Sequence, residues 1–138
     1  MSTRTTFLSR LIGPYSILVP LSMLTHKEAS MAAVNALMHN VPFMLLIGVI
    51  TLAAGLAMVL AHNIWSGGAV PVLVTLVGWI TLVKGLLFLF LPPEAMAGLY
   101  ESLHYQQLFP AWAAIAILIG AYLTYGGFGR DVTASSRR

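Results

Sequence analysis

"VPVLVTLVGWITLVKGLLFLFL", residues 70–91, is the stretch that decides the fold. It contains a single charge, Lys84, and lies between Ser66-Gly67-Gly68 and Pro92-Pro93. At about 1.5 Å rise per residue, a helix of this length spans roughly 33 Å, which is enough to cross a hydrocarbon core of about 30 Å. We therefore predict a transmembrane helix with one charged side chain inside it.

The composition of the chain indicates that its solvent is lipid. Of the 138 residues, 59% are hydrophobic and only 8% are charged, whereas soluble proteins carry about 25% charged residues. The length fits one integral membrane domain, residues 1–138. There is no cysteine, which excludes disulfides, thiolate metal sites and thiol nucleophiles. Most of the basic residues lie near the two ends, which is typical of topology control and not of a nucleic-acid surface: Arg4, Arg10, Arg130, Arg137 and Arg138.

Three further apolar stretches predict additional crossings: residues 7–24, 41–61 and 108–125. The first is the weakest because Pro14 and Pro20 interrupt it. It also lacks a small-residue cleavage site, so we predict a retained helix and not a signal peptide.

The last crossing is expected to stop at Gly126-Gly127, with residues 130–138 as a mobile polar tail. Small residues four apart suit close helix packing. They recur at Ala53, Ala57 and Ala61 in one span and at Ala116 and Gly120 in another.

Two short amphipathic helices are predicted between the spans, at residues 29–40 and 94–105. We expect both to lie along the outer, non-cytoplasmic surface of the membrane that the chain crosses. Four crossings put both termini on one side, and the terminal arginines predict that this side is the cytoplasm. The apolar faces of the two short helices consist of Met31, Val34 and Met38 in the first and Met96, Leu99, Tyr100 and Leu103 in the second.

The chain also resembles itself at an offset of 65 residues, which aligns 11–63 with 76–128 without a gap. The short amphipathic helices superimpose at the same offset, so each repeat is predicted to be span, surface helix, span. Because each repeat crosses the membrane twice, the two repeats have the same orientation in it. They are then related by a rotation axis along the membrane normal. Two hydrophobic hairpins of similar length are the alternative. Identical pairs are Leu11/Leu76, Gly13/Gly78, Leu21/Leu86, Leu24/Leu89, Met31/Met96, Ala32/Ala97, His39/His104, Ile50/Ile115 and Gly55/Gly120.

Lys84 is the first candidate functional residue, because a charge inside a span is costly and usually meaningful. It could line a proton or ion path, bind an anion or act as a counter-ion. Alternatively, it could snorkel toward the outer headgroups, or pair with Glu28 or Glu94, which the topology puts on the same side.

His62-Asn63 is the second candidate, as a ligand site or as a helix C-cap with Asn in the left-handed position. Thr75 is the expected partner of Asn63, and the pair His62 and Asn63 is predicted to be separate from Trp79 and Lys84. His39 and His104 correspond in the repeat, but only Glu101 could join them as a third ligand, so no metal site is predicted.

Nucleotide loops, paired intramembrane carboxylates and nucleophile elbows are absent, so we predict no enzymatic activity and no cofactor. The lipid bilayer is the predicted environment, with a membrane-protein partner or a homo-oligomer and no nucleic acid. The leading expectation is an accessory or assembly subunit. The alternative is a small oligomeric transporter or channel that uses Lys84.

One segment resembles small uncharacterised bacterial inner-membrane proteins that carry an HNxW loop followed by a TLxGWxxLxKG helix. The resemblance covers residues 11–92 and transfers no activity. It implies a four-helix protein of the bacterial inner membrane, and it adds weight to His62, Asn63, Trp79 and Lys84 as a set. The matching residues are His62, Asn63, Trp65, Thr75, Leu76, Gly78, Trp79, Leu82, Lys84 and Gly85.

Overall fold

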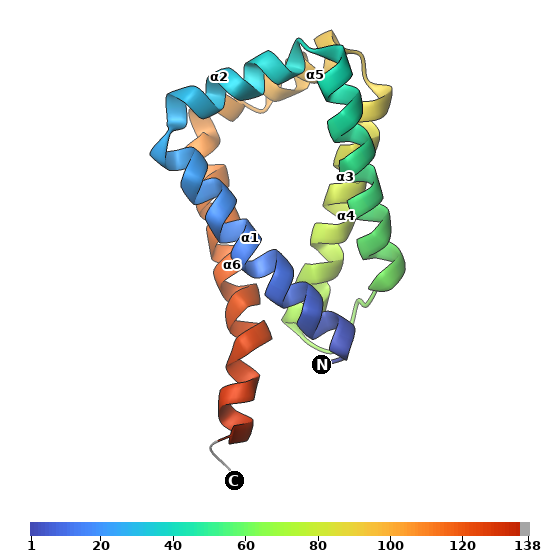
Figure 1. Cartoon of the computed structure of the whole chain (residues 1–138), viewed down its shortest axis with the longest axis vertical. Coiled ribbons are helices and arrows are strands. Elements are labelled where there is room, and N and C mark those ends of the chain that lie inside the picture. The colour runs from blue at the N-terminus through green and yellow to red at the C-terminus, as the bar shows by residue number, and fades with distance from the viewer. Residues whose placement is uncertain (136–138) are drawn as a thin grey trace.

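The structure, a computed structural model, is all-α in the part of the chain that it describes (Figure 1). It describes residues 1–135, with side chains through residue 129. The helices are α1 (Thr3–Thr25), α2 (Lys27–Met38), α3 (Val41–Ala61), α4 (Ala69–Phe90), α5 (Pro93–Ser102) and α6 (Tyr105–Ser135).

Four of these helices are long and apolar enough to cross a membrane: α1, α3, α4 and residues Tyr105–Gly129 of α6. The four predicted spans are therefore confirmed as candidate crossings of a multi-pass membrane protein. α1 begins before the predicted span because the Ser2 hydroxyl caps it, accepting a hydrogen bond of 3.2 Å from the backbone N–H of Thr5.

α2 and α5 lie together at one end of the four long helices (Figure 1). α2 begins and ends two residues before the predicted helix. α5 ends at Ser102 and not at residue 105, because His104 adopts a φ of 50° and turns the chain into α6. Met38 and Met96, one from the predicted apolar face of each short helix, are both buried.

The four long helices pack as two antiparallel pairs, α1 with α6 and α3 with α4 (Figure 1). The predicted repeats, each made of span, surface helix and span, are therefore not separate packing units, because each pair takes one helix from each half of the chain. Within α3–α4 the contacts are made at glycines. A Cβ atom on Gly55 would lie 2.5 Å from Cα of Leu82, and one on Gly85 would lie 2.6 Å from Cα of Leu52. Only glycine permits this approach of the backbones.

Glycines also set the α1–α6 contact. A Cβ atom on Gly120 would lie 2.7 Å from the carbonyl oxygen of Gly13, and one on Gly127 would lie 3.0 Å from Cγ of Arg10. The predicted stop at Gly126-Gly127 is wrong, since α6 continues through both residues to Ser135. Neither glycine has a positive φ, and both serve close approach to another helix instead. Of the predicted polar tail, residues 136–138 lie outside the described residues.

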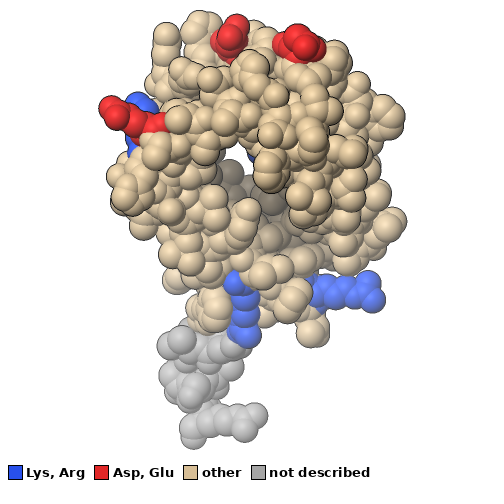
Figure 2. Space-filling model, turned by 45° about the horizontal axis from the view of Figure 1, so that its top comes forward, with Lys and Arg blue, Asp and Glu red and all other residues tan. Residues whose placement is uncertain are grey.

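Two buried clusters lie toward the two ends of the long helices, and the lower one contains residues of both helix pairs. The lower cluster joins α1, α4 and α6, and the upper cluster joins α2, α3, α4 and α5. Between these clusters the two pairs separate, and the surface is hollowed in the middle of the face seen in Figure 2. The lower cluster consists of Leu8, Ile12, Val74 and Leu123, and the upper cluster of Met38, Met44, Phe88 and Met96.

Charge is distributed unevenly along the molecule. Acidic side chains gather at the end formed by α2 and α5, and basic ones at the opposite end, where α1 begins (Figure 2). The acidic residues are Glu28 on α2 and Glu94 and Glu101 on α5, with Lys27 beside them at the start of α2.

The row of small residues on α3 faces away from α4. Ala53, Ala57 and Ala61 are exposed, whereas Gly48 and Gly55 on the opposite face of the helix are buried. The alanine row therefore does not make the packing contact inside this chain.

Candidate functional site

His62 is the C-cap residue of α3 and is only 2% exposed. Its Nε2–H donates a hydrogen bond of 3.2 Å to the carbonyl oxygen of Pro71, since a carbonyl can only accept. Nδ1 is buried without a partner among the described residues. The helix ends in extended backbone at His62, and Asn63 has no positive φ, so the cap is not the left-handed form that was predicted.

Thr75 fastens the loop after α3 to α4. Its hydroxyl accepts from the backbone N–H of Ile64 at 3.0 Å and lies 2.9 Å and 3.1 Å from the carbonyl oxygens of Ile64 and Pro71. The predicted Asn63–Thr75 contact is therefore wrong by one residue, because the hydroxyl bonds to the backbone of Ile64.

Asn63 instead contacts two indole groups. Its Oδ1 accepts from Nε1 of Trp65 at 2.8 Å and from Nε1 of Trp79 at 3.3 Å. The predicted separation of the His62–Asn63 pair from the Trp79–Lys84 pair is wrong in this respect, because Trp79 reaches back to the loop. The four residues nevertheless do not form one site, since Lys84 is not bonded to the other three.

Lys84 lies on α4 between the two buried clusters. Val77, Lys84 and Leu91 follow one another at seven-residue spacing and so share a face of the helix. Val77 packs against the lower cluster and Leu91 against the upper one. The ammonium lies 5.9 Å from the ring centroid of Phe88, and no pairing with Glu28 or Glu94 is present among the described residues. Lys84 also borders a shallow apolar depression with Trp79, Ile80, Val83 and Leu87.

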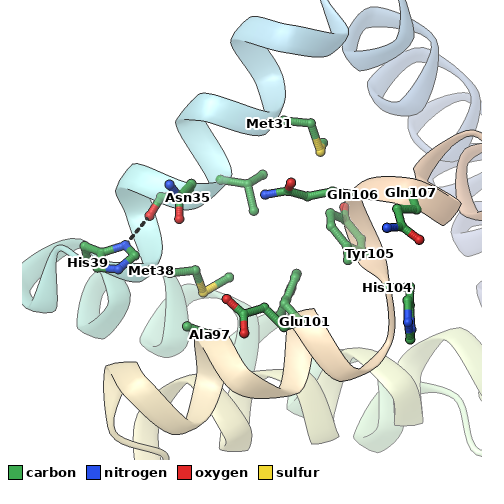
Figure 3. A pocket seen from close by; sticks show the side chains of 12 residues that line it. Met31, Asn35, Met38, His39, Ala97, Glu101, His104, Tyr105, Gln106 and Gln107 are labelled. Carbon is green, nitrogen blue, oxygen red and sulfur yellow. Dashed lines mark hydrogen bonds between the residues drawn. The ribbon is translucent and has the colours of Figure 1, made fainter.

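A deeper pocket, of about 350 Å³, lies where α2, α5 and the start of α6 meet (Figure 3). We call it the α2–α5–α6 pocket. One wall is apolar, and polar side chains surround the rest. The lining residues are Met31, Val34, Asn35, Met38, His39, Ala97, Tyr100, Glu101, His104, Tyr105, Gln106 and Gln107.

Both pocket histidines are fixed by backbone carbonyls. Nδ1–H of His39 donates to the carbonyl oxygen of Asn35 at 2.8 Å, and Nδ1–H of His104 donates to that of Ser102 at 3.1 Å. In the neutral rings Nε2 is then an acceptor. The described residues contain no group of three histidine or acidic side chains arranged to hold a metal ion.

Three aromatic rings continue from the pocket into α6. Tyr100 and Tyr105 meet edge to face with centroids 4.8 Å apart, and Tyr105 meets Phe109 at 5.8 Å. Burial, with a smaller contribution from Tyr105, raises the pKa of Tyr100 to about 12. The Tyr100 phenol is therefore neutral at physiological pH.

His39, Glu101 and His104 were weighed from the sequence as metal ligands, and the apolar wall was predicted as the faces of two short helices, but the other polar groups of the pocket were not recognised. Asn35, Gln106 and Gln107 show no motif, and their convergence requires α2 to lie close to α5 and to the start of α6 (Figure 3). The available signal was the repeat, which makes α2 and α5 equivalent elements.

Comparison of the chain with protein-family models finds no match, and comparison with curated proteins and with solved structures finds no significant similarity. The resemblance to bacterial inner-membrane proteins with an HNxW loop therefore stays a prediction.

Proposed function

We propose that this chain is a non-enzymatic inner-membrane protein that works by packing against other membrane helices, as an accessory or assembly subunit or as a homo-oligomer. The observation that carries this proposal is the outward-facing row of small residues on α3. Without a hydrophobic driving force inside lipid, helices associate where small side chains let their backbones approach. The internal α3–α4 contact uses Gly48 and Gly55, which leaves the alanine row available to another helix.

We further propose that the fold arose by internal duplication, and contacts that repeat at the 65-residue offset support this. Gly55 approaches Thr81 and Leu82, while Gly120 approaches Ser16 and Ile17. Each residue of the first contact lies 65 positions from its counterpart in the second. Gly78–Val59 and Gly13–Thr124 are related in the same way. The two halves would then be related by an axis along the membrane normal.

The duplication provides an internal comparison for the association surface. The repeat counterparts of Ala53 and Ala57 on α6 are Leu118 and Tyr122, both large and exposed. The two halves therefore differ in side-chain size on their outward faces, and only the α3 face is lined by small residues at these positions.

Cysteine crosslinking in native membranes tests the proposal, because the chain contains no other thiol. We expect an Ala53→Cys variant to form a crosslinked homodimer or an adduct with one larger membrane protein. The matched control is Leu118→Cys, which occupies the same position in the other half and should crosslink weakly.

Native mass spectrometry of the protein in mild detergent then distinguishes a homo-oligomer from a complex with a partner. Equal crosslinking at positions 53 and 118, together with a monomer in the mass spectrum, would contradict the proposal.

A small oligomeric transporter or channel is the second candidate, and the position of Lys84 between the two buried clusters favours it. A lysine at this depth would attract an anion or relay a proton along the face of α4 that carries Val77 and Leu91. In proteoliposomes, Lys84→Met should then abolish anion or proton flux. Lys27→Met, outside the spans, should leave the flux unchanged. Absence of flux in the wild-type protein would remove this candidate.

A further inference from the structure

We propose that the α2–α5–α6 pocket binds an organic ammonium group that carries an apolar chain. This proposal is independent of helix association, because the pocket lies at the α2 and α5 end of the molecule and shares no residue with the alanine row. A lipid headgroup with a primary amine and a free alkylamine offer the same chemistry.

The pocket carries a negative charge that favours a cationic ligand. Glu101 is the only lining residue with a formal charge when both histidines are neutral, and it has no ion-pair partner among the described residues. Its carboxylate extends from α5 into the space below α2 (Figure 3). At the same end of the molecule Glu28 and Glu94 outnumber Lys27, so the net charge there favours a cation over an anion, although each charge outside the pocket is screened and contributes little at the site.

The aromatic side chains of the pocket also favour a cationic ligand. Tyr100 and Tyr105 line the pocket and pack edge to face. A ring face carries partial negative charge, so a cation held near a Tyr ring is stabilised. An aromatic pair beside a carboxylate is therefore suited to an ammonium group.

Hydrogen-bond acceptors and an apolar wall complete the arrangement. Gln106 extends from α6 toward α2, and Asn35 lies on α2 across from it (Figure 3). Their amide oxygens can accept from ammonium N–H groups. Met31, Val34 and Met38 of α2 form the apolar side, which can contact an alkyl chain.

A metal ion fits this pocket less well than an organic cation does. The two imidazoles lie at opposite ends of the pocket in Figure 3, and no set of three metal ligands is present among the described residues. An organic ammonium needs no such convergence, because a carboxylate and ring faces recognise it from different sides.

The test is a calorimetric titration of the purified full-length protein with hexylammonium chloride at pH 7. Glu101→Gln removes the carboxylate charge and keeps the shape of the side chain. It should weaken binding about tenfold, because the amide oxygen can still accept a hydrogen bond but no longer carries the charge that attracts the ammonium group. Glu94→Gln is the matched control, because it removes the same charge from α5 outside the pocket. It should leave affinity within about twofold.

The source of the amine is resolved by native mass spectrometry with phosphatidylethanolamine and phosphatidylglycerol. Preferential retention of phosphatidylethanolamine that Glu101→Gln abolishes would support a lipid headgroup. Hexylammonium binding without lipid preference would support a free amine.

Two results would overturn the proposal. One is equal hexylammonium affinity in the Glu101→Gln and Glu94→Gln variants. The other is binding of hexanol as tight as that of hexylammonium. Circular dichroism should show unchanged helix content in both variants, since both side chains are exposed.

Discussion

Replacement of Gly55 by alanine should destabilise the protein, although alanine is the better helix former. The added Cβ atom would lie 2.5 Å from Cα of Leu82, against an optimal carbon–carbon separation of about 3.5–4.0 Å. Because this atom belongs to the backbone of α4, no side-chain rotation relieves the contact. The helix axes must move apart by about 1 Å, which also loosens the reciprocal contact of Gly85 with Leu52.

The size of the effect follows from two opposing contributions. Overpacking costs about 1–3 kcal/mol, and a contact between backbones takes the upper end of that range. Alanine recovers about 1 kcal/mol of helix propensity. We therefore expect a loss of about 2 kcal/mol in the free energy of unfolding, or about 30-fold in the ratio of folded to unfolded protein.

Gly98 on α5 provides the matched control, since a Cβ atom there would meet nothing within 4 Å. Gly98→Ala should gain up to about 1 kcal/mol from helix propensity alone. The assay is reversible unfolding in mixed detergent micelles, monitored by circular dichroism. If Gly55→Ala were as stable as Gly98→Ala, the close α3–α4 packing described above would be refuted.

Three other perturbations test separate parts of the structure. Thr75→Val should lower the free energy of unfolding by about 1–3 kcal/mol, because it removes the acceptor of the Ile64 N–H. Thr81→Val loses only a hydrogen bond within α4 and should lower it by about 1 kcal/mol or less in the same assay. Because burial raises the pKa of Tyr100 from 10.0 to about 12, the folded state keeps the phenol proton to higher pH than the unfolded state does. The free energy of unfolding should therefore fall as the pH rises from 10 to 12. If a Tyr100→Phe variant lost as much stability over the same pH range, this explanation would be contradicted. A cytoplasm-only reporter fused after the last residue should give signal if the arginine-rich end is cytoplasmic, and signal from a periplasm-only reporter instead would reverse the orientation.

The loop between α3 and α4 shows how far local sequence patterns extend. The sequence singled out His62, Asn63, Thr75 and Trp79 as polar or aromatic groups near one membrane face. It assigned the wrong partners, because Thr75 bonds to Ile64 and Asn63 to Trp79. A shift of one residue along the loop changes which group meets the hydroxyl, and hydropathy does not specify that register.

The four long helices, their apolar character and the two short helices between them were determined by the sequence itself. Each depends on the length and hydrophobicity of a continuous segment, which is a local property. The pairing of α1 with α6 and of α3 with α4, the outward direction of the alanine row and the α2–α5–α6 pocket were decided only by the tertiary structure. They depend on the rotation of each helix about its axis, and close approach at Gly13, Gly55, Gly85 and Gly120 fixes that rotation between residues far apart in the chain.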